Sequence, residues 1–225
     1  MRTYGQYCPI ARAAEILAER WTPIIVRNLL MGCHTFSEIL EAAPGLSRSL
    51  LSQRLATLQR FKIVERGDHP SGRGHAYYLT PVGEDLWPVC EAMGAWGARW
   101  LDLGRSEFDP HLVLWDISKK VEEDRLPEER VVVRFDVSDR GKRKRLWLVL
   151  EPGHREVCDK DPGYGEDIVL RTDAGSLVQW HMGRLSLAGA LKDGTVELDG
   201  PPRLTRRFIS DWQGLNSFAG ISPAR

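Results

Sequence analysis

The stretch TFSEILEAAPGLSRSLLSQRLATLQRF, residues 35–61, decides how the first half of the chain folds. Thr35 can cap a short helix, because Glu38 follows three residues later, as in a capping box. Ser47 can cap a second helix that runs to about Phe61. A turn at 43–46 contains Gly45 and separates the two. This order is typical of a helix-turn-helix.

The second of these helices has two chemically different faces. Its apolar stripe repeats at spacings of four and three residues and consists of Leu51, Leu55 and Leu58. The rest of its surface is small, polar and basic. Such a face can meet base edges or phosphates in the major groove of DNA, and we expect these contacts from Ser47, Arg48, Ser49, Ser52, Gln53 and Arg54.

The flanking segments extend this motif. Upstream, 8–20 and 22–31 read as helices, the second with Pro23 in its first turn. Downstream, two β-like runs at 63–66 and 76–80 are joined by a glycine-rich loop and predict a hairpin, or wing. Residues 43–75 carry six Arg and Lys against two acids. We therefore expect the wing to meet DNA as well, through Arg66, Arg73 and His75.

A further helix is expected to begin at Thr80-Pro81. Its apolar residues recur at spacings of three and four, as in a coiled-coil seam, and are Leu86, Val89, Met93, Trp96 and Trp100. One interpretation is that the seam packs on its own domain. We favour a dimer interface formed with Ile10 and Leu17 of the first helix, because two tryptophans on one stripe are much apolar area to leave in water.

These segments together resemble a known family, the HxlR-type winged helix-turn-helix regulators of bacteria, a MarR-like group. The resemblance covers about residues 7–101 and is carried by Cys8-Pro9, Glu19-Arg20-Trp21-Thr22, Phe36-Ser37-Glu38-Ile39, Leu46-Ser47, Leu51-Ser52-Gln53-Arg54-Leu55 and Tyr78-Leu79-Thr80-Pro81-Val82-Gly83. It implies a homodimer that pairs through its terminal helices and binds double-stranded DNA.

The second half of the chain has a different pattern of predicted helices and strands. A short helix at 112–121 is followed by five β-like runs and three helical segments, which predicts an α+β domain with helices on one face of the sheet. We expect a first domain over 1–104, a second over 111–213 and a tail over 214–225. The basic turn 138–145 is either a solvated turn that protects a sheet edge or an auxiliary DNA contact.

Residues 167–208 resemble the sterol-carrier-protein-2-like domain, with a strand into Thr172-Asp173, a helix to Gly183-Arg184-Leu185, and the run 193–200. That family binds lipids or other apolar molecules in a tunnel between sheet and helices. The resemblance implies an apolar effector and a candidate pocket, although the same residues fit an ordinary core equally well; they are Trp147, Leu177, Trp180 and Met182.

Other chemistry is not indicated. No GxSxG, HExxH or phosphate-loop motif occurs, so we expect no enzyme. The four cysteines have no zinc spacing, and we expect neither metal nor cofactor. No signal peptide or membrane span is expected, and the spread cysteines suit a reducing cytoplasm, with the protein at the nucleoid when it is bound to DNA.

Three functional hypotheses remain. The first is a homodimeric transcriptional regulator that reads a pseudo-palindromic operator with the 47–60 helix and the basic wing, under control of an apolar small molecule in its second domain. The second is a regulator that senses oxidants or electrophiles through Cys8. The third is a lipid carrier whose helical half only dimerises.

Overall fold

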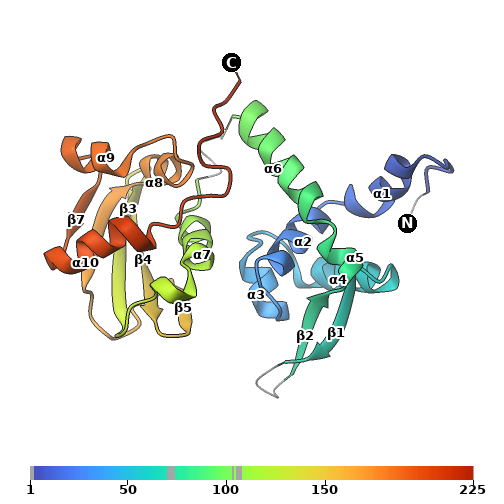
Figure 1. Ribbon diagram of the computed structural model, residues 1–225, viewed down its shortest axis with the longest axis horizontal. Coiled ribbons are helices and arrows are strands. Elements are labelled where there is room, and N and C mark those ends of the chain that lie inside the picture. The colour runs from blue at the N-terminus through green and yellow to red at the C-terminus, as the bar shows by residue number, and fades with distance from the viewer. Residues whose placement is uncertain (1–2, 70–73, 103, 105–107, 225) are drawn as a thin grey trace. The chain divides into compact units, whose positions relative to one another are not determined.

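The computed structural model describes residues 3–69, 74–102, 104 and 108–224. The chain divides into two compact units, Met1–Gly94 and Ala95–Arg225, and each is described here by itself (Figure 1). Within the described residues, no helix combines the length and the apolar character that crossing a membrane requires.

The first unit is a winged helix-turn-helix, as predicted. Thr35 caps its third helix with the full capping box: the backbone N–H of Glu38 donates to Thr35, and the Glu38 carboxylate accepts from the backbone N–H of Thr35. Its elements are α1 (Pro9–Leu17), α2 (Thr22–Leu30), α3 (Phe36–Glu41), α4 (Arg48–Arg60), β1 (Val64–Asp68), β2 (His75–Leu79) and α5 (Pro81–Glu84), followed by α6 (Trp87–Trp100), which contains the boundary between the units.

The predicted apolar stripe of α4 forms the core of this unit. Leu51, Leu55 and Leu58 are buried, as are Ile25 of α2 and Ile39 of α3. The wing strands pair antiparallel from Val64 opposite Leu79 to Asp68 opposite His75. The helix-turn-helix and the wing therefore pack on the same hydrophobic core.

The helix expected from Thr80 onward is two helices, α5 and α6. Thr80 caps α5 by accepting a hydrogen bond from Gly83 N–H, and Leu86 N–H then donates to Gly83 O at 3.1 Å in a tighter turn. Pro88 has no N–H to donate to Glu84, so a continuous α-helix would lack a hydrogen bond there. The prediction of one uninterrupted helix was wrong on this point, and Leu86 lies just before α6.

The second unit has the expected α+β fold. Its elements are α7 (Pro110–Lys120), the 3-10 turn η2 (Glu123–Arg125), β3 (Val131–Asp139), β4 (Lys142–Glu151), β5 (His154–Cys158), β6 (Ile168–Asp173), α8 (Ala174–His181), α9 (Leu187–Asp193), β7 (Glu197–Asp199), α10 (Pro202–Arg207) and the π-helical turn η3 (Phe208–Trp212). The five strands form one sheet in the order β5-β4-β3-β6-β7. Only β3 and β6 pair in parallel among these described strands, and the other neighbours are antiparallel.

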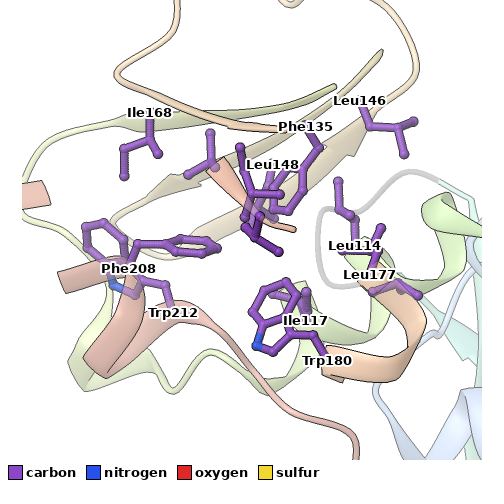
Figure 2. Packing of buried hydrophobic residues seen from close by; sticks show 14 of the residues in the cluster. Leu114, Ile117, Phe135, Leu146, Leu148, Ile168, Leu177, Trp180, Phe208 and Trp212 are labelled. Atoms are coloured by element: carbon purple, nitrogen blue, oxygen red, sulfur yellow. The ribbon is translucent and has the colours of Figure 1, made fainter. Parts of the chain in front are cut away.

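One face of this sheet packs against the helices and holds the main core (Figure 2). Phe135 of β3 lies edge-on to Phe208, with ring centroids 6.1 Å apart. The ring centroid of Trp180, in α8, lies 6.2 Å from that of Phe208. Leu114 and Ile117 of α7 are fully buried in the same cluster. Alternate residues of β3 therefore supply the helix-facing core.

The opposite face of the sheet carries a smaller apolar cluster and a charged network. The cluster is formed by Val132, Trp147 and Val149. Beside it, the Arg134 guanidinium lies 3.2 Å from the Asp136 carboxylate and also pairs with Glu166. Since Glu166 belongs to the segment between β5 and β6, that segment returns along this face of the sheet.

The C-terminal segment is tied to the second unit by polar contacts. Trp212 donates its indole N–H to the carbonyl of Arg125, at 2.8 Å. Between α8 and α7, the Nε2 atom of the nearly buried His181 lies 2.9 Å from an Asp116 carboxylate oxygen, and Asn216 donates a hydrogen bond to the same oxygen. Residues 208–216 therefore pack against the second unit rather than extend away from it.

Candidate nucleic-acid interface

The exposed face of α4 is the candidate reading surface. Ser47 caps the helix by accepting a hydrogen bond from Leu50 N–H at 3.3 Å, and its hydroxyl lies 3.2 Å from that of Ser49. Among the residues predicted to contact DNA on this helix, five are exposed: Ser47, Arg48, Ser49, Ser52 and Gln53. They begin at the N-terminus of α4, where backbone N–H groups and the helix dipole favour an anion.

Arg48 is the exposed cation of this face. Its guanidinium carbon lies 5.2 Å from the ring centroid of Phe36, at the start of α3. A cation above an aromatic face is held by the ring quadrupole while its remaining N–H groups stay free to donate. The contact restricts the side chain without burying its charge.

Arg54 occupies a different environment from the other five predicted residues. Its guanidinium donates to the Glu19 carboxylate at 2.7 Å and to the carbonyl of Arg20 at 3.1 Å. Only 14% of its side chain is exposed. In this structure Arg54 fixes α4 to the corner between α1 and α2, and it does not lie on the exposed face.

A second set of contacts that holds the helix-turn-helix in place was not identified from the sequence. Asn28 is fully buried in α2 and donates from Nδ2 to the carbonyl of Ile39, at 3.2 Å. Arg27 donates to the Asn28 side-chain oxygen at 2.7 Å and to the carbonyl of Ala42 at 3.1 Å. These bonds satisfy carbonyls at the end of α3, so they hold the first helix of the helix-turn-helix. The only sequence signal was the polar pair Arg27-Asn28 between apolar residues of α2.

Two of the three wing residues predicted to contact DNA are exposed to solvent. Arg66 and His75 are exposed on β1 and β2, and the His75 ring lies 4.0 Å from the Asp68 carboxylate. Arg73 lies outside the described residues. The base of the wing is tied to the helix-turn-helix, because Tyr77 N–H donates to His34 O at 2.7 Å.

The predicted dimer stripe is largely exposed in the single chain. Ile10 of α1 is 80% exposed and Trp96 of α6 is 58% exposed. Three further stripe residues of α6 are also exposed, namely Val89, Met93 and Trp100, whereas Leu17 and Leu86 are partly buried. Neither α1 nor α6 has a fully buried residue.

The structure brings together only part of the predicted apolar pocket. Leu177 and Trp180 are buried in the helix-facing core, with Met182 packed against it. Trp147 lies in the separate cluster on the other face of the sheet. The reason is that β4 is apolar at consecutive positions, 146–150, so its alternation does not reveal which side chains face the helices.

The four cysteines differ in accessibility, and none of the four forms a disulfide. Cys33 is fully buried. Burial raises the pKa of the Cys90 thiol, and burial together with the charge of Glu156 raises the pKa of Cys158. Cys8 is partly exposed directly before α1. Within the part of the chain that the structure describes, no group of three His, Cys, Asp or Glu could hold a metal ion.

Comparison with known proteins assigns the first unit to a family. Residues 16–105 match the model described as HxlR-like helix-turn-helix. The regulator YvaP of Bacillus subtilis, described as an uncharacterized HTH-type transcriptional regulator, is 37% identical over 100 residues, which are 44% of this chain and 93% of YvaP. The chain belongs to the HxlR family.

A further relative is similar over nearly the same length. YodB of Bacillus subtilis, described as an HTH-type transcriptional regulator, is 34% identical over 99 residues, covering 43% of this chain and 88% of YodB. The solved structure titled as the reduced form of YodB covers 44% of this chain and 99% of its own, with a TM-score of 0.38. The present chain is thus an HxlR-family, helix-turn-helix, DNA-binding transcriptional regulator.

Proposed function

We propose that this regulator acts as a homodimer and reads a pseudo-palindromic operator with α4 and its wing. The observation that carries the proposal is the exposed polar and basic face of α4 at Arg48–Gln53. The buried leucines on the opposite face of α4 and the contact of Arg54 with Glu19 hold this helix in place. A helix held rigidly by its buried face can enter the major groove and direct its polar side chains at base edges and phosphates. Arg66 and His75 of the wing would meet the adjacent backbone.

Homodimerisation is supported by the apolar surface of α1 and α6. Large side chains such as Trp96 and Trp100 are more than half exposed, and Ile10 more so. An exposed apolar stripe of this kind marks an interaction surface. A two-fold pair of chains would present two copies of α4 to two half-sites.

The test is DNA binding by variants of the α4 face. We expect Arg48→Ala and Gln53→Ala each to weaken binding to the operator by about 1–3 kcal/mol, if each side chain reads a base. Affinity is measured by gel shift on the DNA upstream of the protein's own gene. Arg206→Ala, which removes an exposed arginine from the second unit, is the matched control. Decreases well below 1 kcal/mol for both variants would place the reading face elsewhere.

We further propose that the second unit makes the regulator responsive to an apolar small molecule. Support comes from the resemblance of residues 167–208 to the sterol-carrier-protein-2-like domain and from the aromatic core under α8 and η3. Leu177, Trp180 and Met182 lie on that side, so a ligand there would part α8 from the sheet. Trp147 faces the other way and would not contact it.

A second candidate is control through Cys8, which is partly exposed and lies directly before α1, a helix of the proposed dimer surface. Two Cys8 thiols from two protomers would form one disulfide, giving two electrons and two protons to an oxidant such as diamide. A Cys8→Ser protein should then keep its operator affinity after diamide treatment, while the affinity of the parent changes. An unchanged diamide response in the Cys8→Ser protein removes this candidate.

Membership of the HxlR family favours both regulator hypotheses over the lipid carrier.

A further inference from the structure

The tip of the β3–β4 hairpin carries a cluster of positive charges, whereas the rest of the second unit has a net negative charge. Five of the six residues 140–145 are Arg or Lys, and all six are exposed. Elsewhere in the second unit, Ala95–Arg225, there are sixteen Arg and Lys against twenty-two Asp and Glu. The chain's overall neutrality therefore hides a separation of charge within this unit.

The backbone turns sharply at the tip. Arg140 and Gly141 both have positive φ, 47° and 77°, which is the two-residue turn that joins antiparallel strands most directly. The charged run therefore lies mostly in β4 itself. Since successive strand residues point to opposite faces, Lys142 and Lys144 lie on one side of the ribbon and Arg143 and Arg145 on the other.

Two of the five cations lie within ion-pair distance of neighbouring carboxylates. Lys144 lies 3.7 Å from the Asp159 carboxylate, and Arg145 lies 3.4 Å from that of Asp136. Among the described residues, Arg140, Lys142 and Arg143 have no carboxylate within ion-pair distance. Asp139 is the one acid in the turn itself. Three uncompensated cations thus project from the end of the ribbon.

The hairpin also has a free edge at this end. β5 pairs with β4 only from Trp147 to Glu151, so residues 142–146 have β3 as their sole strand partner among the described strands. A hollow of about 690 Å³ opens beside that edge and is lined by Asp136, Arg143, Lys144, Arg145, Trp147 and Asp159. Backbone N–H groups and cations are therefore presented side by side, the combination that contacts phosphate oxygens in DNA complexes.

We propose that the hairpin tip 140–145 is a second, sequence-independent DNA contact, bound to the phosphate backbone beside the operator. This inference rests on the proposed operator binding by α4. An anionic membrane is the less fitting partner, because residues 138–145 contain no apolar side chain to insert below lipid headgroups. A two-stranded β-ribbon fits the major groove of a duplex instead, where its cations can contact phosphates.

The experiment measures how binding of the full chain to DNA depends on salt. The test variant combines Arg140→Asn, Lys142→Gln and Arg143→Gln; Asn is chosen at 140 because it tolerates positive φ. The matched control combines Lys192→Gln, Arg203→Gln and Arg206→Gln, which removes the same charge from exposed positions of the same unit. Probes are the protein's own upstream DNA and a scrambled duplex of equal length.

We expect the test variant to lower the slope of log K against log salt by about 0.9 for each phosphate that is no longer neutralised, so by up to roughly 2.7 per protomer. The decrease should be equal on both duplexes, because phosphate contacts carry no sequence information. The control should keep the parent slope. Asp139→Asn, which raises the local charge, should strengthen binding on both duplexes.

Two results would overturn the inference. One is a test variant with the slope of the control on both duplexes while the parent still binds its own upstream DNA; this removes the hairpin contact and leaves operator binding intact. The other is hairpin-dependent binding to phosphatidylserine vesicles with no change on DNA. A parent chain that binds neither duplex refutes operator binding and the hairpin contact together.

Discussion

At the scale of single residues, Asp173 shows how the structural role of one side chain can be tested. It ends β6, caps α8 by accepting a hydrogen bond from Ser176 N–H at 3.0 Å, and also accepts from the Ser176 hydroxyl. Burial raises the pKa of Asp173, but the hydrogen bonds from Ser176 and from the backbone N–H of Gly175 outweigh it. The net effect holds the pKa below its ordinary value of 3.8.

We expect Asp173→Ala to lower the free energy of unfolding of the second unit by about 1 kcal/mol, as for the removal of other N-caps. Asp173→Asn keeps a cap but removes the charge. A carboxyl group with a lowered folded-state pKa stabilises the fold above its unfolded-state pKa, and this contribution disappears as pH falls through the folded-state pKa. The advantage of the parent over Asp173→Asn should therefore vanish towards acid pH.

Urea unfolding followed by tryptophan fluorescence at several pH values measures this difference. Glu128→Gln, an exposed loop change, is the control and should show no such trend. A difference between parent and Asp173→Asn that stays constant down to acid pH would mean that the charge of Asp173 contributes nothing.

At the scale of elements, α6 carries the predicted dimer stripe. Replacing Trp96 and Trp100 by Ser removes two large exposed apolar side chains from its surface. Central aromatic residues of an interface commonly contribute about 2 kcal/mol or more, so the dimer dissociation constant should rise by about 100-fold or more. Analytical ultracentrifugation checks this. Trp87→Ser removes an exposed tryptophan of α6 that lies off the stripe and should leave the dimer intact.

The elements also show what the sequence could and could not predict. The caps at Thr35 and Ser47 were identified correctly, because an N-cap depends on residues three positions apart. Long-range pairing was not accessible in this way. The parallel pairing of β3 with β6 and the inward turn of Arg54 onto Glu19 join residues about 35 positions apart. Nothing in local periodicity encodes such partners.

At the scale of the whole molecule, the joining of two units in one chain predicts communication between them. A ligand changes an equilibrium only by its difference in affinity for the two states. We expect oleate, used as an apolar probe, to change operator affinity by about 5-fold or more if the second unit controls the first. Met182→Gln should weaken that response, and Trp147→Phe, on the other face of the sheet, should not.

Gel shift on the upstream DNA, with oleate binding followed in parallel by tryptophan fluorescence, makes this measurement. Oleate that binds the parent but leaves its operator affinity unchanged contradicts effector control and leaves DNA binding untouched.

The closure of the second unit by Trp212 has a consequence during synthesis. The winged helix is complete once Glu84 has been made, but the second unit requires the indole of Trp212 to reach the carbonyl of Arg125, and Trp212 follows Glu84 by about 130 positions. At roughly 5–20 residues per second, a ribosome needs about 6–25 s to add that length. Each newly made molecule therefore passes through an interval in which its DNA reader can already be folded while its second unit is still unfinished.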